Sequence, residues 1–249
     1  MEKIGKFTFH VEPYLCDLNG KATLPIIGNF MLRAAAMHAE ERGFGYETMT
    51  AIEKTWVLSR FSLQINKYPV IYETVYVQTW IEDVNKIFTQ RCFVLLNEKE
   101  EEIGYGRSIW AAIDINTRRP VNIAEMDNKI FDYLGEDRQI PLRKIGKIAG
   151  STSEPVHFYT PKYSDIDLNQ HFNSIKYIEH FLDLFDIDTY KNKSVCKFEI
   201  AFLSEALPKQ KFLMHKEQIE DDHFLTELKN AENGESVCRA SIFFAAKND

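Results

Sequence analysis

One short segment of this chain occurs twice, and this repeat constrains the fold more than any other feature. Asp17-Leu18-Asn19 recurs as Asp167-Leu168-Asn169, 150 residues later. Each copy follows a strand-like alternating segment and a proline, Pro13 or Pro161, and each leads into an apolar helical pattern. Three shared residues are weak evidence alone, but the order of the surrounding patterns repeats as well. The sequence therefore predicts two structurally related halves.

In the first half, an alternating strand at residues 6–11 precedes a helix. Thr23 is a suitable N-cap, Pro25 sits in the first turn where its missing N–H costs little, and the helix stops near Gly43. Four further strands are indicated by alternating, β-branched and aromatic residues between short polar turns. These strands are predicted at 55–66, 72–83, 86–97 and 102–115.

The second half repeats this order. A strand is predicted at residues 155–160, and a helix from Ser174 to about Leu184 with Asn173 as its N-cap. His180 is expected to face solvent, away from the apolar stripe of this helix. Four strands follow, at 194–204, 211–220, 223–231 and 235–246.

Both predicted helices are apolar on most of their faces, which is typical of a helix that a sheet wraps. The apolar residues are Ile26, Ile27, Phe30, Met31 and Ala34 in the first helix, and Ile175, Tyr177, Ile178, Phe181, Leu182 and Phe185 in the second. A long antiparallel sheet curled around a central helix is the hot-dog arrangement. Two tandem copies predict an α+β double hot-dog.

The repeat also predicts the domain organisation: an N-terminal hot-dog at 1–115, a linker at 116–153 and a C-terminal hot-dog at 154–249. The linker is charged and bears Gly, Ser and Pro, which indicates a segment crossing the surface. Its centre, from Glu125 to Leu134, predicts a short helix ended by Gly135.

Composition narrows the class of protein. The net charge of −7 argues against nucleic acid as the main partner, because phosphate binding needs an excess of Lys and Arg. The start of the chain has no unbroken apolar segment of a signal peptide, and no run approaches the ~18 apolar residues of a membrane span. Cys16, Cys92, Cys196 and Cys238 lie far apart, so we expect reduced, buried thiols in a cytosol. The histidines form no metal-binding pair, so neither a metal nor another cofactor is expected.

The second copy of the repeat gathers polar side chains at a helix start. Asp167, Asn169 and His171 fall within five residues, where unpaired backbone N–H groups and a partial positive charge can bind a developing oxyanion. His171 can act as an acid or base near neutral pH. The same run can serve only for capping and turn formation, and the pattern alone favours that interpretation. In the first copy Lys21 takes the place of His171, which favours one functional site in the second half.

The segment SDIDLNQHFNSIKYIEHFL closely resembles the signature of the fatty acyl-ACP thioesterases of plants and bacteria, which are double hot-dog proteins. The first-half segments FMLRAAAMHAEERGFG and GRSIWAAIDINTRRPV are similar to that family in order and style. The resemblance implies hydrolysis of the thioester between a fatty acyl chain and acyl carrier protein. It also implies a soluble, bacterial cytoplasmic form, because the transit peptide of the plant enzymes is absent.

The resemblance further implies a catalytic set of Asp167, Asn169 and His171 with an acid from a later strand. We assign that acid to Glu205, with Glu199 as the alternative if the register slips. Glu205 and His171 would activate a water, Asn169 and backbone N–H groups would bind the carbonyl, and Asp167 would hold the loop. Ala206 stands where some plant members carry a cysteine, which argues against a cysteine nucleophile and leaves Cys196 as a core residue.

An apolar tunnel in the first half is expected to select the acyl chain, although for any single candidate residue the pattern favours a plain core role. These candidates are Phe30, Met31, Ala34, Trp56 and Phe61. The acidic carrier protein would dock on a local basic patch. Candidates for the patch are Arg118, Arg119, Arg143, Lys144, Lys147, Lys162 and Lys176.

Three alternatives remain at this point: an acyl-CoA thioesterase, a hot-dog enoyl hydratase or dehydratase, and a non-catalytic acyl-binding hot-dog. The hydratases place a proline within their Asp/His motif, and Asp167 and His171 have none between them. The sequence leaves open the preferred chain length and whether two chains pair as a homodimer.

Overall fold

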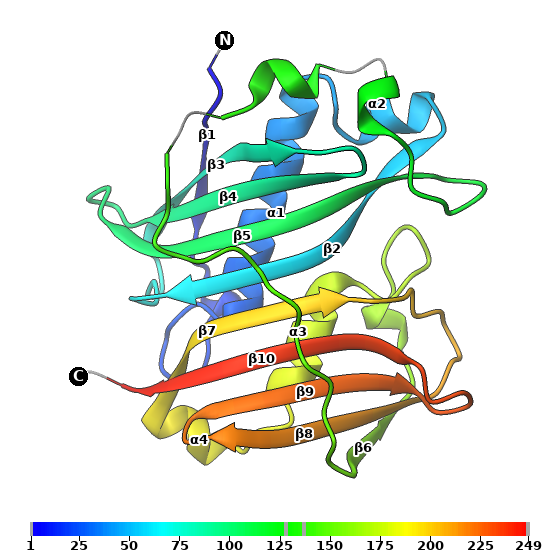
Figure 1. Ribbon diagram of the computed structural model, residues 1–249. Coiled ribbons are helices and arrows are strands. Elements are labelled where there is room, and N and C mark those ends of the chain that lie inside the picture. Colours follow the sequence, from blue (N-terminus) through cyan, green and yellow to red (C-terminus); the bar gives the residue numbers. More distant parts are fainter. Residues whose placement is uncertain (1, 127–128, 136–137, 248–249) are drawn as a thin grey trace. The chain divides into compact units, whose positions relative to one another are not determined.

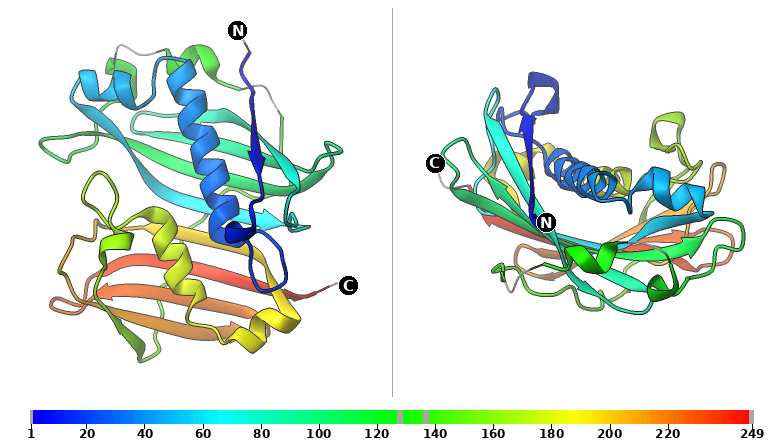
Figure 2. Two further views of the ribbon diagram at one scale, coloured as in Figure 1. Left: turned by 180° about the vertical axis from the view of Figure 1, so that it is seen from behind. Right: turned by 90° about the horizontal axis from the view of Figure 1, so that it is seen from above.

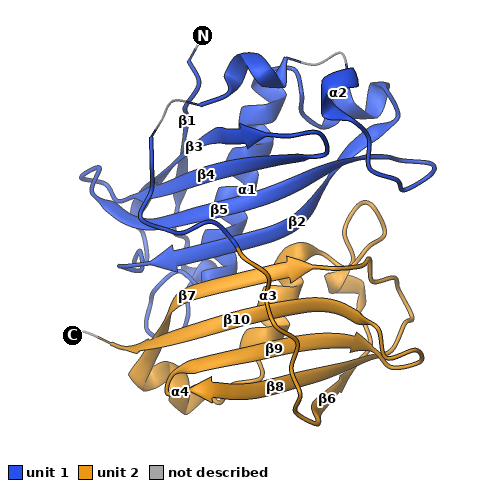
Figure 3. Ribbon diagram, in the orientation of Figure 1, with its two compact units in different colours: residues 1–145 blue, residues 146–249 orange. Residues whose placement is uncertain are grey.

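The computed structural model describes residues 2–126, 129–135 and 138–247 (Figure 1). The chain divides into two compact units, Met1–Ile145 and Gly146–Asp249 (Figure 3). Each unit contains one antiparallel run of five strands and one principal helix. The double hot-dog architecture predicted from the repeat is confirmed. The finer division into 1–115, 116–153 and 154–249 stays a prediction.

In the first unit, the strands are ordered β1-β3-β4-β5-β2, and every neighbouring pair is antiparallel. Helix α1 lies across one face of these strands (Figure 2). As predicted, Thr23 caps it by accepting a hydrogen bond from the Ile26 N–H at 3.4 Å. The elements are β1 (Gly5–His10), α1 (Leu24–Glu41), α2 (Tyr46–Ala51), β2 (Lys54–Ile65), β3 (Thr74–Val84), β4 (Phe88–Leu96) and β5 (Glu102–Asp114).

The second unit repeats this plan with the order β7-β10-β9-β8-β6, again antiparallel throughout. The predicted N-cap is confirmed, because the Asn173 side chain accepts from the Ile175 N–H at 2.8 Å. The elements are β6 (Pro155–Tyr159), α3 (Ser174–Leu182), α4 (Ile187–Asn192), β7 (Lys193–Phe202), β8 (Phe212–Glu220), β9 (His223–Asn230) and β10 (Ser236–Ala246). Helix α3 buries Tyr177, Ile178 and Phe181 against its own sheet.

The linker differs from its prediction. In place of one helix from Glu125 to Leu134, two 3-10 turns form at Ile123–Glu125 and Ile130–Tyr133. Residues 127–128, within the predicted helix, lie outside the described residues. Ile123 and Ile130 are buried in a cluster with Phe44. A 3-10 turn suits this sequence because each turn needs to bury only one isoleucine.

Nor does the linker simply cross the surface. Ile140 and Leu142 are buried against Trp80 and Val94, on the face of the first sheet opposite α1. The Leu142 carbonyl accepts a hydrogen bond from Arg107 Nε at 2.8 Å. Alternating apolar residues thus let an extended segment cover a sheet face that would otherwise expose Trp80.

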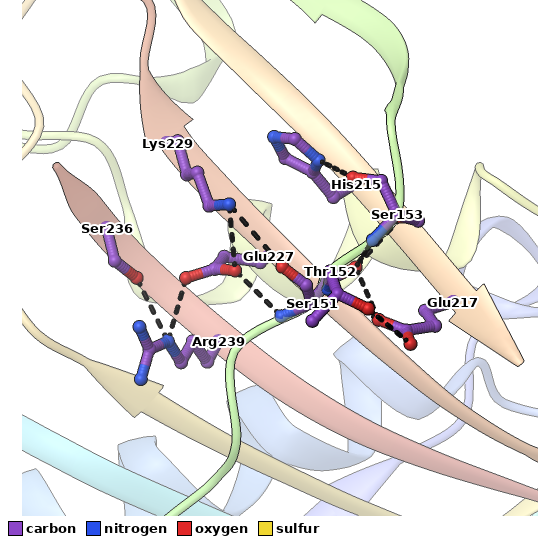
Figure 4. Close-up of polar contacts among 9 residues, drawn as sticks. All are labelled: Ser151, Thr152, Ser153, His215, Glu217, Glu227, Lys229, Ser236 and Arg239. Atoms are coloured by element: carbon purple, nitrogen blue, oxygen red, sulfur yellow. Dashed lines mark hydrogen bonds and ion pairs between the residues drawn. The ribbon is translucent and has the colours of Figure 1, made fainter. Parts of the chain in front are cut away.

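Where the linker enters the second unit, polar contacts fix it to β8 and β9 (Figure 4). The Ser151 N–H donates to Glu227 at 2.8 Å, and the Thr152 N–H donates to Glu217 at 2.6 Å. Glu227 is 1% exposed and also accepts from Arg239 Nε at 2.8 Å. Burial favours its neutral form, but its hydrogen bonds and the guanidinium hold the pKa of Glu227 below its usual value. The carboxylate therefore stays charged and anchors the linker before β6.

Candidate active site

The loop from Asp167 to His171 is closed by its own hydrogen bonds. The Asp167 carboxylate accepts from the Asn169 N–H at 2.8 Å and from the His171 N–H at 3.2 Å. The Asp167 N–H donates to the His171 carbonyl at 2.9 Å, and the Gln170 N–H donates to the Asp167 carbonyl at 3.0 Å. Gln170 has φ +64°, the left-handed conformation that a turn this tight requires. The geometry fixes where the His171 side chain leaves the loop.

Two further contacts join this loop to its neighbours. The Asn173 N–H donates to the Asp165 carbonyl at 2.8 Å, at the start of α3. The Phe172 N–H donates to the Ala206 carbonyl at 3.1 Å, which ties the loop to the segment after β7. Because Glu205 precedes Ala206 in that segment, the tie brings Glu205 beside the loop.

The side chains of His171 and Glu205 meet beside this loop. Their Nε2 and Oε2 atoms are 3.3 Å apart, and their side chains are 25% and 40% exposed. The alternative acid Glu199 lies within β7 and pairs with Lys197 at 3.1 Å. A carboxylate beside an imidazole can orient the ring and help take a proton from a water held next to the pair. Partial exposure leaves the pair accessible to a substrate.

The other two candidates lie on the same loop. Asn169 is exposed, two residues before His171, at the start of the segment leading into α3. Asp167 is half-buried, and its carboxylate is engaged by backbone N–H groups of the loop. The structure thus gathers all four sequence-predicted residues, and the side chains of His171 and Glu205 contact each other.

The prediction that His180 faces solvent is wrong. Its Nε2 lies 2.9 Å from Oδ1 of Asp165, and its side chain is 20% exposed. Asp165 itself is 3% exposed and also accepts from the Tyr159 hydroxyl. Sequence reasoning missed this buried polar group because its members come from β6, the loop and α3. A residue-by-residue comparison of the two halves would have signalled it, since Phe9, Leu15 and Phe30 occupy the matching positions.

The cysteines agree only in part with the expectation of buried thiols. Cys92 and Cys238 are buried, but Cys16 and Cys196 are half-buried, and all four are free. The Cys196 thiol donates to the Phe243 carbonyl at 3.4 Å, and burial raises its pKa. A raised pKa favours the unreactive thiol over the thiolate.

The candidate acyl-chain residues pack inside the first unit. Phe30, Met31, Ala34 and Phe61 are buried, whereas Trp56 is half-buried and donates its Nε1–H to the Phe44 carbonyl at 2.9 Å. Their role in substrate binding stays a prediction.

The candidate basic residues are mostly exposed. In the linker they are Arg118, Arg119, Arg143, Lys144 and Lys147. Lys162 is also exposed, whereas Lys176 is half-buried and paired with Glu179 at 2.5 Å. Among the residues that the structure describes, no helix is long and apolar enough to cross a membrane.

Comparison with known proteins relates the chain to one family. Residues 2–130 match the model of the acyl-ACP thioesterase N-terminal domain, and residues 149–246 match that of the acyl-ACP thioesterase C-terminal domain. The crystal structure of an acyl-ACP thioesterase from Bacteroides thetaiotaomicron is 40% identical, with a TM-score of 0.91 over 98% of each chain.

Two plant proteins extend the comparison. The 12:0-ACP thioesterase from Umbellularia californica is 22% identical, with a TM-score of 0.83 over 98% of this chain and 95% of its own, which supports the fold. The chloroplastic oleoyl-acyl carrier protein thioesterase 2 of Arabidopsis thaliana is 28% identical over 211 residues, 76% of this chain and 57% of the relative. The chain thus spans little more than half the length of such curated relatives.

Proposed function

Because the chain belongs to the acyl-ACP thioesterase family, we propose that it hydrolyses fatty acyl-[acyl carrier protein] to a free fatty acid and the carrier protein. The observation that carries this proposal is the His171–Glu205 pair, 3.3 Å apart beside the start of α3. The pair stands beside a helix N-terminus, whose partial positive charge can stabilise a developing oxyanion. A thioester hydrolase needs these two elements: an activated water and a site for the developing oxyanion.

In the proposed reaction, His171 and Glu205 hold a water and accept its proton as the water oxygen attacks the acyl carbon. Asn169 donates to the carbonyl oxygen as it gains negative charge, and the partial positive charge at the start of α3 stabilises that charge. The C–S bond then breaks, and the thiolate of the phosphopantetheine arm leaves. The corresponding thiol has a pKa near ~8.5, so the leaving group needs little help from an acid. Asp167 contributes by keeping the loop closed.

The acyl chain would be selected in the first unit. Each buried CH₂ contributes about 0.8 kcal/mol, so a few methylenes decide the preferred substrate. The proposed lining comes from two elements of this unit. It consists of Phe30, Met31 and Ala34 on α1 and of Trp56 and Phe61 on β2.

The acidic carrier protein would bind the exposed basic residues of the linker and Lys162. We place the protein in the bacterial cytoplasm, where a carrier-bound fatty acyl chain is made. The 40% identical protein from a bacterium supports this placement.

A direct assay tests the proposal. The purified chain is mixed with acyl-ACP and acyl-CoA substrates of several lengths, and both free thiol and free fatty acid are measured. We expect thiol release from acyl-ACP, with the wild-type rate lost in His171→Ala. Release from acyl-CoA alone would identify the carrier as coenzyme A, and turnover of both in the His171→Ala protein would remove the proposed mechanism.

A further inference from the structure

A buried polar group lies directly behind the candidate active-site loop. The Asp165 carboxylate accepts hydrogen bonds from the Tyr159 hydroxyl, from His180 Nε2 at 2.9 Å and from the Lys162 N–H at 2.5 Å. The rings of Tyr159 and His180 also contact each other, with centroids 4.2 Å apart. We call Tyr159, Asp165 and His180 the polar triad, in which Asp165 is buried and the two rings are half-buried.

The first half of the chain builds the same positions from apolar side chains. Phe9, Leu15 and Phe30 correspond to Tyr159, Asp165 and His180 at the 150-residue offset of the repeat. Phe9 and Phe30 stack with centroids 4.8 Å apart, and the rings of Tyr159 and His180 at the matching positions are 4.2 Å apart and tilted by 45°. The fold therefore accepts two packed rings and one further apolar side chain at these three positions, and none of the three side chains has to be polar.

Polar side chains at these positions lose hydration when the protein folds, and the apolar side chains of the first half avoid this free-energy cost. A carboxylate 3% exposed loses its hydration, and only close donors offset that loss. Burial opposes ionisation, but the Tyr159, Lys162 and His180 hydrogen bonds outweigh it and lower the pKa of Asp165. The directional bonds restrict the orientation of all three side chains, whereas stacked apolar rings can slide.

The triad is connected to both members of the candidate catalytic pair. The rings of Tyr159 and His180 lie 6.1 Å and 5.7 Å from the ring of Phe172, the residue after His171. The Phe172 N–H in turn donates to the Ala206 carbonyl, next to Glu205. The Asp165 carbonyl accepts from the Asn173 N–H at the start of α3. A shift of the triad would therefore move His171, Glu205 and the helix start.

We propose that Tyr159, Asp165 and His180 are positioning residues that fix Phe172 and so hold the His171 imidazole against the Glu205 carboxylate. This inference rests on the proposed function, since it assigns the triad to the same site. The triad touches no reacting atom in this scheme. Its effect comes from restricting the backbone between Asp165 and Asn173.

The decisive variant gives the second half the apolar set of the first: Tyr159→Phe, Asp165→Leu and His180→Phe together. Because the first half folds with Leu15 at the matching position and with Phe9 stacked on Phe30, we expect a folded protein with a cooperative thermal transition. We expect kcat for acyl-ACP to fall about 10- to 100-fold, as for a misplaced catalytic group, with KM within about threefold of wild type. A triple variant with wild-type kcat would overturn the inference.

A matched pair of single variants separates positioning from packing. His180→Gln keeps an N–H donor for Asp165, and we expect kcat within about threefold of wild type. His180→Phe fills the space without a donor, and we expect most of the loss seen in the triple variant. Equal kcat values in the two single variants would show that the hydrogen bond has no positioning role. This pair serves also if the triple variant does not fold.

A structural readout keeps the inference independent of turnover. In a crystal structure of His180→Phe, we expect His171 Nε2 and Glu205 Oε2 to separate beyond hydrogen-bond distance. A pair that keeps the wild-type spacing of 3.3 Å would contradict the inference even if the wild-type chain hydrolysed no acyl-ACP. Inactive wild-type protein would instead count against the proposed function alone.

Discussion

The backbone N–H groups of the two repeated loops make matching hydrogen bonds, while the side chains at the end of each loop differ. In the first loop the Asp17 carboxylate accepts from the Asn19 and Lys21 N–H groups at 2.8 and 3.1 Å. In the second loop Asp167 accepts from Asn169 and His171 at 2.8 and 3.2 Å. The backbone bond that closes each loop is 2.8 Å in the first copy and 2.9 Å in the second.

The match continues on both sides of the loops. A 3-10 turn precedes each one, at Pro13–Leu15 and at Tyr163–Asp165. The residue after each loop, Ala22 or Phe172, donates its N–H to a carbonyl on a neighbouring segment. The repeated aspartate is therefore explained by the loop's closure. The two loops therefore share a backbone structure, and the difference that matters for catalysis lies in their side chains.

The largest expected difference between the copies concerns the residue that ends each loop. His171→Ala should lower kcat for acyl-ACP about 100- to 10,000-fold, the range typical of a general acid–base group. Lys21→Ala removes a half-buried side chain at the matching place, and we expect less than a twofold change. Steady-state kinetics on both variants measures the comparison. Comparable losses in the two would show that the first loop also serves the reaction.

The second largest expected effect concerns the aspartates that close the two loops. Asp17→Ala and Asp167→Ala each leave two loop N–H groups without their acceptor, so each should lower the free energy of unfolding by about 1–3 kcal/mol. Only Asp167→Ala should also lower kcat, because only its loop carries the imidazole. Urea unfolding and kinetics on the same samples separate the two effects. An Asp167 variant that loses stability and keeps wild-type kcat would show that Asp167 only holds the loop closed and has no effect on catalysis.

The response to acid should also distinguish the halves, since Asp165 stands where the first half has Leu15. Hydrogen bonds to its carboxylate lower the folded-state pKa of Asp165 below the unfolded value. Its contribution to stability is therefore complete above the unfolded pKa, about 3.9, and is lost as the pH falls through the lower folded value. His180 and Tyr159 face this carboxylate.

We expect the stability advantage of the wild type over Asp165→Leu to shrink as the pH is lowered from 5 toward 2. Urea unfolding of both proteins at several pH values gives this difference directly. Other acids with lowered pKa values, such as Glu227, contribute to both proteins and cancel. Parallel pH curves for the two proteins would exclude a lowered Asp165 pKa.

Periodicity predicted the fold where the physical cause is local. The alternating segments became strands, and the caps at Thr23 and Asn173 stand where their side chains can accept the first free N–H groups. The two six-residue helices, Tyr46–Ala51 and Ile187–Asn192, were missed. Helices this short depend on packing at their ends, because nucleation costs more than so few hydrogen bonds return.

The candidate site was predictable as far as it is contiguous. Asp167, Asn169 and His171 are neighbours in the sequence, but Glu205 comes beside them through the hydrogen bond from Phe172 to Ala206, which no local pattern shows. His180 was assigned to solvent because a helical pattern shows only its own neighbours. The carboxylate that it contacts lies 15 residues earlier, on another element.

The smallest expected effect tests whether the backbone of the two loops plays the same role in both halves. Gly20 and Gln170 occupy the same loop position with φ of +68° and +64°. A Cβ at Gly20 would meet only Ile71, 4.0 Å away, so Gly20→Ala should cost about 1 kcal/mol through conformation alone. Gln170→Gly relieves that strain but frees the unfolded chain, so we expect a change below about 0.5 kcal/mol and unchanged kcat. If Gln170→Gly instead lowers kcat at constant stability, the strained backbone at this position aims His171, and the two loops differ in more than their side chains.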